Sequence, residues 1–328
     1  MSLISTNFCF KNNHGYGLGS KFINTNIKKH NSNNSIGISG LDSSNSSSSS
    51  NNSMKTNTTI IARFGYQTIV ILLIIVCYVY ILNFAIFPQI ETTEYKGRIN
   101  GILSSILTVL ILSNYYLAST TNPGSYKDTL SPSYYLVHPP SEDVEKRFCN
   151  KCNEQKVERA HHCRYCNRCV LRMDHHCLWL QNCVGLFNQK YFVLFLWYSS
   201  ISIIYFFYLL IDRSLEIVST HALEHTLPEI DIFQLILLGM LIIVLVVAVI
   251  TLVSLLFNQL WMITKNVTTI EIEDAKRKGS VLHYKKYDRS ILNNYIQIFG
   301  DPSIFWLLPT SPKNNKQFNS KKGDIFIV

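Results

Sequence analysis

The stretch CNKCNEQKVERAHHCRYCNRCVLRMDHHCLWLQNC, from Cys149 to Cys183, contains seven of the nine cysteines of this 328-residue chain. Cys149 and Cys152 form one C-x-x-C pair, and a C-x-x-C-x-x-C run begins at Cys163. Two residues between cysteines allow both thiolates to reach one metal ion across a tight turn. Cysteines gathered in one place are not a disulfide framework for the whole chain, so the pattern predicts a metal site or catalysis.

Four long apolar runs without charged residues flank this stretch, two before it and two after it. A helix needs roughly 20 mostly apolar residues to cross a bilayer. Only 16% of the chain is charged, whereas a soluble domain has about 25%. The fourth run is longer than a bilayer requires, so we expect it to tilt or to continue as helix past the membrane surface. The runs are Thr68–Phe87, Gly101–Ser119, Tyr191–Ile211 and Ile232–Ile263.

The distribution of Lys and Arg indicates how the runs are oriented. Six of these residues precede the first run, ten lie between the second and third, and eleven follow the fourth. The other two loops contain two and one. Positive residues accumulate on the cytosolic side of membrane proteins, so we expect both termini and the cysteine-rich stretch to face the cytosol. The net charge of +9 then reflects topology, and no nucleic-acid partner is expected.

The predicted fold is an all-α membrane protein with four transmembrane helices and a cytosolic zinc-binding cysteine-rich domain between helices two and three. Residues 1–66 are rich in Asn and Ser. We expect them to form a disordered cytosolic arm, because they cannot bury enough apolar surface to offset their ordering entropy. The other expected parts are 67–120 (helices one and two), 121–190 (cysteine-rich zinc domain), 191–263 (helices three and four) and 264–328 (cytosolic C-terminal segment).

Four histidines strengthen the prediction of zinc. His161, His162, His175 and His176 accompany the seven cysteines, and the cytosol is too reducing for disulfides to persist. Structural zinc takes four protein ligands in a tetrahedron. Two such sites, filled by six cysteines and two histidines, would leave one cysteine over.

Cys177 is the candidate for this remaining cysteine. It ends the sequence Asp174-His175-His176-Cys177, in which an acid, imidazoles and a thiol are adjacent. A thiol is nucleophilic as its thiolate. A neighbouring histidine can take its proton, and an aspartate can hold that histidine in the required tautomer. From spacing alone, Cys177 could equally be a metal ligand.

The stretch resembles the cysteine-rich domain of the DHHC protein S-acyltransferases, also called palmitoyltransferases. The resemblance continues to Phe192, and the order of apolar runs around the stretch is also similar to that family. It covers most of the chain except the N-terminal arm and the last residues. Further similar motifs are Asn182–Gly185, Asn188, Asn122-Pro123-Gly124 (Asp-Pro-Gly in the family), Thr268–Glu271 (Thr-Thr-x-Glu), Asn294–Gly300 and Trp306–Pro309.

The resemblance implies two structural zinc ions and a catalytic cysteine. Cys177 would be the nucleophile, His175 its base, and Asp174 the residue that orients His175. The implied ligand sets are Cys149, Cys152, His162 and Cys169 for the first zinc ion, and Cys163, Cys166, His176 and Cys183 for the second.

The implied function is protein S-acylation. A long-chain fatty acyl group would pass from an acyl-CoA such as palmitoyl-CoA to Cys177, and then to cysteines of target proteins. The implied partners are membrane-associated proteins with cytosolic cysteines and the lipid bilayer. The implied location is the Golgi, the endoplasmic reticulum or the plasma membrane. Basic residues of the loop, among them Arg172 and Lys190, could contact the CoA phosphates, but solvated or lipid-facing charges explain each of them more simply.

Three positions depart from the family pattern. Val157 and Leu178 stand where the family usually has Pro, and Asn122 stands where it usually has Asp. Losing a proline loosens a turn without removing a ligand. The alternative hypothesis is therefore a catalytically weak or inactive zinc-stabilised membrane scaffold. A transporter is disfavoured, because its spans would carry buried ionisable residues and the four runs carry none.

Overall fold

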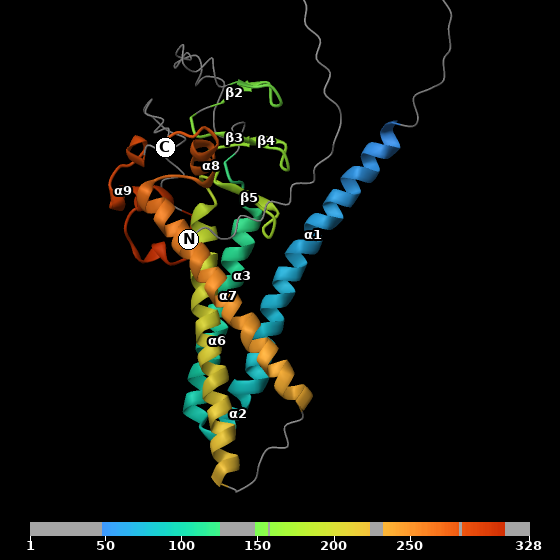
Figure 1. The fold of residues 1–328 in the computed structure, drawn as a ribbon, viewed down its shortest axis with the longest axis vertical. Coiled ribbons are helices and arrows are strands. Elements are labelled where there is room, and N and C mark those ends of the chain that lie inside the picture. The colour runs from blue at the N-terminus through green and yellow to red at the C-terminus, as the bar shows by residue number, and fades with distance from the viewer. Residues whose placement is uncertain (1–47, 125–147, 157, 224–231, 282–283, 312–328) are drawn as a thin grey trace, which may run out of the picture. The chain divides into compact units, whose positions relative to one another are not determined.

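A computed structural model describes residues 48–124, 148–156, 158–223, 232–281 and 284–311 (Figure 1). The chain divides into two compact units, residues 1–51 and 52–328. Of the first unit, the described part is Ser48–Asn51, which opens helix α1. The remaining elements belong to the second unit, and the fold below is that of this unit.

Four long helices dominate the second unit, and four helical segments are long and apolar enough to cross a membrane, the first of which continues from α1 to Thr92. The prediction of four transmembrane helices with the cysteine-rich domain between the second and third is confirmed. Apolar side chains on their outer surfaces are exposed, as lipid contact requires; Ile243 is 65% exposed. The helices are α1 (Ser48–Ile81), α3 (Glu94–Thr120), α6 (Gln189–Leu223) and α7 (Ile232–Lys265). Their candidate spans are Gly65–Thr92, Glu94–Thr120, Gln189–Thr220 and Ile242–Lys265.

Helix α1 begins well before the first apolar run. We expected a disordered arm over residues 1–66; the structure describes residues 48–66 as part of this helix, while residues 1–47 lie outside the described part. Once an apolar run is helical, each residue added at its end gains one hydrogen bond for one residue fixed, so polar residues can extend the helix. After α1 the chain continues through a π-helical turn, Leu82–Ile86, and the short helix α2, Phe87–Thr92.

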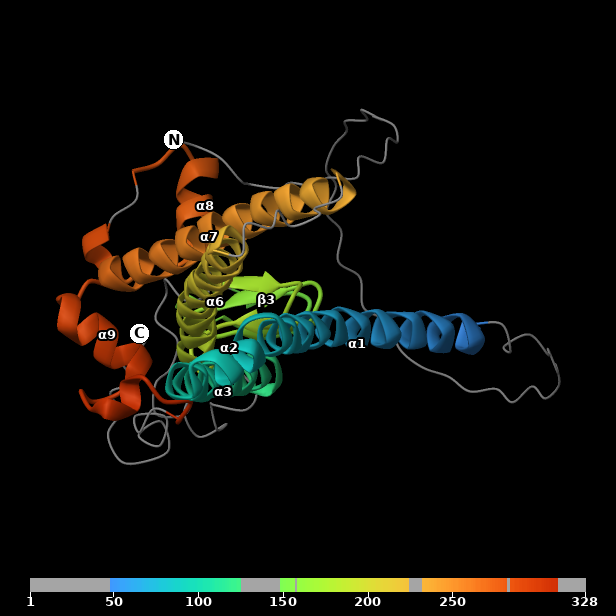
Figure 2. The ribbon, with the colours of Figure 1, turned by 90° about the horizontal axis from the view of Figure 1, so that it is seen from below.

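Helix α6 packs between α3 and α7, as Figures 1 and 2 show. Asn100 marks the face of α3 that meets α6, because its Oδ1 accepts a hydrogen bond from the Tyr205 hydroxyl at 2.9 Å. Ser104 and Thr108 follow at intervals of four residues and are buried, so they lie on the same face. Small side chains at this contact allow the two helix backbones to approach closely.

A polar network joins the helices at the end remote from the cysteine-rich domain. Asp212 on α6 accepts hydrogen bonds from Gln89 Nε2 at 2.6 Å and from Lys96 Nζ at 2.8 Å. Gln89 is 1% exposed, and its Oε1 accepts from Asn100 at 2.8 Å. Lys96 and Asp212 are thus two of the ionisable residues within the candidate spans; both lie outside the apolar runs, and they pair with each other.

The cysteine-rich domain consists of three antiparallel hairpins of very short strands. The first pairs Phe148 with Gln155, the second pairs His162 with Cys169, and the third pairs His176 with Cys183. The strands are β1 (Phe148–Cys149), β2 (Glu154–Gln155), β3 (His161–Cys163), β4 (Arg168–Val170), β5 (His175–Cys177) and β6 (Asn182–Val184). Gly185, directly after the third hairpin, allows a close approach, because a Cβ there would lie 2.7 Å from the carbonyl oxygen of Pro123.

The C-terminal segment packs back onto the helices and the hairpins. Thr268 and Glu271 form a capping box at the start of α8, which satisfies backbone N–H groups of its first turn. Ile298 and Phe299 of α9 pack into a core cluster with residues of α3, α6 and α7. The elements are α8 (Thr269–Arg277), η2 (Tyr284–Lys286), α9 (Ile291–Phe299) and η3 (Ile304–Trp306).

We predict that Asp212→Leu destabilises the helix bundle. The substitution leaves the buried amide of Gln89 without its acceptor, which should lower the free energy of unfolding by about 1–3 kcal/mol. Thermal unfolding in detergent measures the change. Glu94→Leu is the control, because Glu94 pairs with Arg98 where both side chains are exposed, and such pairs contribute about 0–1 kcal/mol. Equal shifts for both variants would contradict a special role for the network.

Candidate zinc centres and active site

The first two hairpins place a C-x-x-C pair in the same kind of turn. The residue after the pair is Asn153 in the first hairpin and Asn167 in the second, and both have positive φ, 54° and 49°. Asparagine adopts this left-handed conformation more readily than most residues. The backbone N–H of Cys166 donates to Sγ of Cys163 at 3.4 Å. Each turn therefore directs both of its sulfurs toward one point.

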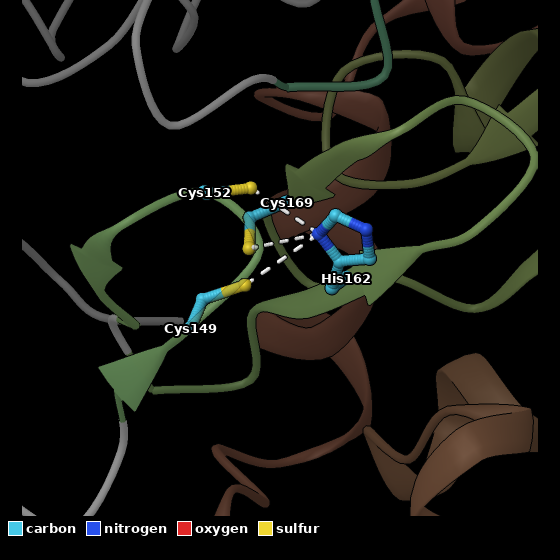
Figure 3. A group of neighbouring side chains, drawn as sticks. All are labelled: Cys149, Cys152, His162 and Cys169. Carbon is cyan, nitrogen blue, oxygen red and sulfur yellow. Dashed lines mark hydrogen bonds between the residues drawn. The ribbon is translucent and has the colours of Figure 1, made fainter.

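The first predicted ligand set is brought together across two hairpins. Figure 3 shows the three sulfurs gathered around the imidazole of His162. The distances from His162 Nδ1 to the sulfurs of Cys149, Cys152 and Cys169 are 3.5, 3.2 and 4.0 Å. Cys149 and Cys152 come from the first hairpin, whereas His162 and Cys169 come from the second.

The second predicted ligand set links the second hairpin to the third. The distances from His176 Nδ1 to the sulfurs of Cys163, Cys166 and Cys183 are 3.6, 3.4 and 3.6 Å. Cys163 and Cys166 belong to the second hairpin, while His176 and Cys183 face each other across the third. The two sets are therefore interleaved along the chain.

Both sets fit a structural zinc ion. In each, the four ligand atoms lie within 4.8 Å of one another. Around tetrahedral zinc with Zn–S ≈ 2.3 Å and Zn–N ≈ 2.0 Å, neighbouring ligand atoms are roughly 3.5–3.8 Å apart, which agrees with most of the distances above. Three thiolates and one imidazole also form a common structural zinc set. Neither set leaves a position open for water.

The third hairpin repeats the turn but lacks the second cysteine. Cys177 lies fourteen residues after Cys163, which lies fourteen residues after Cys149. Leu180 stands where the first two hairpins have their second cysteine. Gln181, with φ 51°, stands where they have asparagine. Cys177 belongs to neither ligand set in the described part of the chain, so the sulfur at this third turn has no metal partner there.

Cys177 instead interacts with His175, which in turn bonds to Asp174. His175 Nδ1 lies 2.8 Å from Asp174 Oδ2, and the Cys177 thiol is hydrogen-bonded to the same imidazole. The Asp174 side chain is 1% exposed, whereas that of His175 is 30% exposed. The structure thus brings all three predicted catalytic residues into one connected group.

The three groups shift one another's pKa values toward charged forms. Burial opposes the imidazolium, but hydrogen bonds to Asp174 and Cys177 outweigh it and raise the pKa of His175 to about 10. Burial also opposes the thiolate, but the bond to His175 outweighs it and lowers the pKa of Cys177. Burial would raise the pKa of Asp174 as well, but its hydrogen bond to His175 lowers it overall. Near neutral pH, these directions favour a Cys177 thiolate beside a His175 imidazolium.

Residues far away in the sequence hold Asp174 in place. Its Oδ1 accepts from the backbone N–H of Thr269 at 2.7 Å, and its Oδ2 accepts from Gln259 Nε2 at 3.0 Å. The Thr268–Glu271 motif therefore both caps α8 and contacts the active-site group. Sequence reasoning missed Gln259. The available signal was one of a few amide side chains inside a mostly apolar run.

A buried polar network connects the hairpins to the end of α7. Arg159 donates to both carboxylate oxygens of Glu271 at 2.7 and 3.0 Å, and to the side chain and backbone oxygens of Asn266. Asn266 in turn donates to the carbonyl of Tyr287 at 2.7 Å. Because Arg159 is 3% exposed, its charge requires these partners. The network holds the C-terminal segment against the hairpins.

Two of the basic residues considered for the CoA phosphates are not surface charges. Arg172 and Lys190 are each 2% exposed. Arg172 donates to Gln189 and to Asn266 Oδ1, and Lys190 donates to the carbonyls of Phe305 and Thr310 at 2.8 and 2.9 Å. The interpretation of these two as solvated or lipid-facing charges is wrong, because segments distant in the sequence cover them.

Apolar side chains surround Cys177 on the side of the long helices. Cys177 belongs to a cluster of buried, mostly apolar residues, and partly buried residues from all four long helices pack against that cluster: Val70, Leu117, Phe195, Leu252 and Leu256. The buried members of the cluster besides Cys177 are Tyr115, Ala118, Leu180, Val184, Tyr191, Phe192 and Leu196.

Side chains replace proline in holding the turn after Cys177. Leu178 is 56% exposed, so it contributes little packing of its own. The Tyr115 hydroxyl donates to the carbonyl of Trp179 at 2.9 Å, and Gln67 Nε2 donates to the carbonyl of Leu180 at 2.8 Å. At the second departure, Asn122 Oδ1 accepts from the N–H of Gly124 at 3.1 Å, which an aspartate would also do. The third departure, Val157, lies outside the described residues.

Fold and site together define a multi-pass membrane protein with a zinc-binding cysteine-rich domain and an Asp-His-Cys group. A family model described as DHHC palmitoyltransferase matches residues 142–276. A Dictyostelium discoideum protein named as a ZDHHC-type palmitoyltransferase is 58% identical over 284 residues, which cover 84% of this chain and 64% of that protein. An Arabidopsis thaliana protein named Probable protein S-acyltransferase 15 is 32% identical over 229 residues, which cover 66% of this chain and 86% of that protein.

The Homo sapiens palmitoyltransferase ZDHHC20 is 27% identical over 267 residues, which cover 71% of this chain and 69% of that protein. The match to the Dictyostelium relative thus spans less than two thirds of that relative's length. The match to the Arabidopsis relative spans most of it. The chain belongs to the DHHC palmitoyltransferase family, and the resemblance inferred from its sequence motifs is confirmed.

We predict that His175→Gln changes the pH dependence of Cys177 reactivity. Without the imidazole, burial still raises the pKa of the thiol, and only backbone hydrogen bonds at Trp179 and Leu180 oppose it, so the pKa should rise toward or above the usual value of about 8.5. Alkylation by iodoacetamide should then be slow at pH 7 and still increase above pH 9, whereas the wild type should level off at lower pH. Peptide mass spectrometry reads the reaction at Cys177. His161→Gln is the control, and identical profiles for wild type and His175→Gln would contradict the assignment.

Proposed function

We propose that this protein is a protein S-acyltransferase, which moves a long-chain fatty acyl group, such as palmitoyl, from acyl-CoA to cysteines of target proteins. One observation carries the proposal: Cys177 is outside both zinc-ligand sets, hydrogen-bonded to His175, and surrounded by apolar residues from four helices. The names of the relatives support the same activity. No described feature favours an inactive scaffold, because the turn with Leu178 is held by other side chains.

The first step is acylation of Cys177. Its thiolate attacks the carbonyl carbon of the acyl-CoA thioester and forms a new carbon–sulfur bond. The bond to the CoA sulfur breaks, and the CoA thiolate leaves with the proton from the His175 imidazolium. Asp174 keeps His175 oriented throughout the step. One thioester replaces another, so no ATP is required.

The second step transfers the acyl group to a target protein. His175, now neutral, takes the proton of the target cysteine, whose sulfur attacks the carbonyl carbon of the Cys177 thioester. The Cys177 thiolate leaves and pairs again with the imidazolium. Because the two substrates react in turn with the same sulfur, the kinetics should be ping-pong.

The apolar cluster is the proposed site of the acyl chain. Burying a methylene group contributes about 0.8 kcal/mol, so a long chain can supply much of the binding energy. Side chains from all four long helices belong to this cluster or pack against it. This arrangement would place the thioester at the cytosolic surface and the acyl chain within the membrane.

The two zinc ions are proposed to be structural. Their ligands would be the two interleaved sets, and when bound they supply cross-links between hairpins too small to have a hydrophobic core of their own. His176 of the second set directly precedes Cys177, and Cys183 lies on the strand paired with it. The second site therefore determines where the nucleophile stands relative to α6.

Orientation and partners follow from the same proposal. Both termini and the cysteine-rich domain would face the cytosol, as the Lys and Arg distribution indicates. The targets would be membrane-associated proteins whose cysteines reach the cytosolic surface. The membrane would be the Golgi, the endoplasmic reticulum or the plasma membrane.

We predict that Cys177→Ala abolishes acylation of the protein. Wild-type protein in detergent should take label from a clickable palmitoyl-CoA analogue, and the label should be released by hydroxylamine, which cleaves thioesters. Cys177→Ala should lose at least roughly a hundredfold in label, since the nucleophile is absent. Cys77→Ser is the matched control, because Cys77 lies on α1, outside the cysteine-rich domain. A wild type without label would favour the scaffold hypothesis.

A pocket of about 560 Å³ between the two ligand sets is the proposed site for the CoA phosphates. Lys151, Lys156 and Arg164 line it, together with the aromatic rings of Phe148 and Tyr165. No acidic side chain is among the described residues of its lining. Lysine and arginine are the usual phosphate-binding groups, and aromatic rings suit a stacked base.

We predict that Lys156→Glu weakens acyl-CoA binding without slowing the chemistry. The acyl-CoA concentration that gives half-maximal labelling should rise roughly tenfold, because an attractive charge becomes repulsive. The maximal rate should stay within about twofold of the wild type, because the change weakens binding of the ground state and of the transition state equally. Lys278→Glu, an exposed charge just beyond α8, serves as the control. A fall in maximal rate with unchanged half-saturation would place the CoA elsewhere.

A further inference from the structure

Four side chains form a continuous line of hydrogen bonds that ends on the carboxylate of Asp174. Arg172 Nη1 donates to Gln189 Oε1. Gln189 Nε2 donates to Gln259 Oε1 at 3.4 Å, and Gln259 Nε2 donates to Asp174 Oδ2 at 3.0 Å. None of the four is more than 5% exposed. The line runs from Arg172, just after the second hairpin, through Gln189, the first residue of α6, to Gln259 on α7.

The chemistry of the two ends determines the direction of every bond in the line. A guanidinium can only donate and an ionised carboxylate can only accept. Each glutamine must therefore turn its oxygen toward Arg172 and its nitrogen toward Asp174. Reversing either amide would place two acceptors or two donors face to face among side chains that are almost completely buried, which is costly. Gln259 is consequently held as a donor toward Oδ2.

The Asp174 carboxylate has a low intrinsic barrier to rotation about its last side-chain bond, since such torsions are broad. Its Oδ1 is held by the N–H of Thr269, and its Oδ2 receives both Gln259 and His175. Of the two donors to Oδ2, His175 cannot fix this oxygen, because the orientation of its own imidazole depends on Asp174. Gln259 is therefore the side chain that holds Oδ2 in place independently of His175.

We infer that Gln259 is a positioning residue: it holds Asp174 Oδ2 where that oxygen directs the His175 imidazole toward Cys177, and Gln189 and Arg172 hold Gln259 in turn. The reaction that this positioning serves rests on the proposed function. The positioning itself is a property of the hydrogen-bonded line. Because Gln189 opens α6 and Gln259 lies on α7, the packing of these two helices then sets the geometry of the active site.

The test uses three substitutions of Gln259 in the full-length protein in detergent. Gln259→Met has nearly the same volume but no donor. Gln259→His restores an N–H, and Gln259→Glu places a second carboxylate beside Asp174. Asn258→Met is the matched control, because Asn258 is the neighbouring amide on α7 and is exposed. Zinc content and thermal unfolding are measured for every variant, so that a folding defect is recognised.

Two rates are measured: acylation of Cys177 over a range of palmitoyl-CoA concentrations, and its alkylation by iodoacetamide. We expect Gln259→Met to lower the maximal acylation rate roughly tenfold with an unchanged half-saturating concentration, because misplacement of a reacting group acts on the chemical step. Alkylation should slow in parallel. Gln259→His should recover to within about threefold of the wild type, while Gln259→Glu should be slower than Gln259→Met.

Wild-type rates in Gln259→Met would overturn the inference. So would equal rates in the His and Met variants, because a merely structural role predicts no rescue by a donor. If Gln259→Met loses zinc, Gln189→Met becomes the deciding variant, since it breaks the line one bond further away and should give an intermediate loss. A wild type that is not acylated while its alkylation still depends on Gln259 would refute the proposed function and leave the positioning role intact.

Discussion

A carboxylate that is almost completely buried must find a donor for each of its oxygens, and this requirement organises the structure around Asp174. Its three donors come from three separate places: His175 on the adjacent strand, Gln259 on α7 and the backbone of Thr269 at the start of α8. Leaving any of these bonds unmade would cost a large part of the free energy gained by burial. The hairpins, the long helices and the C-terminal segment can therefore coexist in only one arrangement near the site.

The hairpins show how one local structure can serve two purposes. All three place a cysteine at the start of a similar turn, and the first two add a second cysteine and contribute to the ligand sets. In the third, Leu180 replaces that second cysteine and joins the apolar cluster around Cys177. A single exchange of sulfur for an aliphatic side chain thus accompanies the change from a cysteine within a ligand set to a cysteine outside both sets. The same turn geometry is retained, because Gln181 adopts the left-handed conformation.

Buried charges connect the cysteine-rich domain to the rest of the chain. The side chains of Arg159, Arg172 and Lys190 are almost completely buried. Arg159 bonds to Glu271 of α8, Arg172 to Gln189 of α6, and Lys190 to the carbonyl of Phe305 in the C-terminal segment. A buried charge without partners would be strongly destabilising, so the C-terminal segment is required for the stability of the site as well as for its shape. At the opposite end of the helices, Lys96 and Asp212 also pair across α3 and α6, but their side chains are partly exposed.

Much of the fold and of the site could be predicted from the sequence, because the signals are local. Apolar runs predict the existence and order of the four spans. The spacing of Cys149 to Cys183 predicts metal sites, and family resemblance implies the ligand sets and the role of Cys177. The tertiary structure alone decided the roles of Gln259, Arg172 and Lys190 and the early start of α1. Gln259, within a mostly apolar run, and Lys190, just before one, carry no mark of their partners, because those partners lie tens of residues away in the sequence. Only the packing of α6 against α7, and of the C-terminal segment against both, brings these groups within hydrogen-bonding distance.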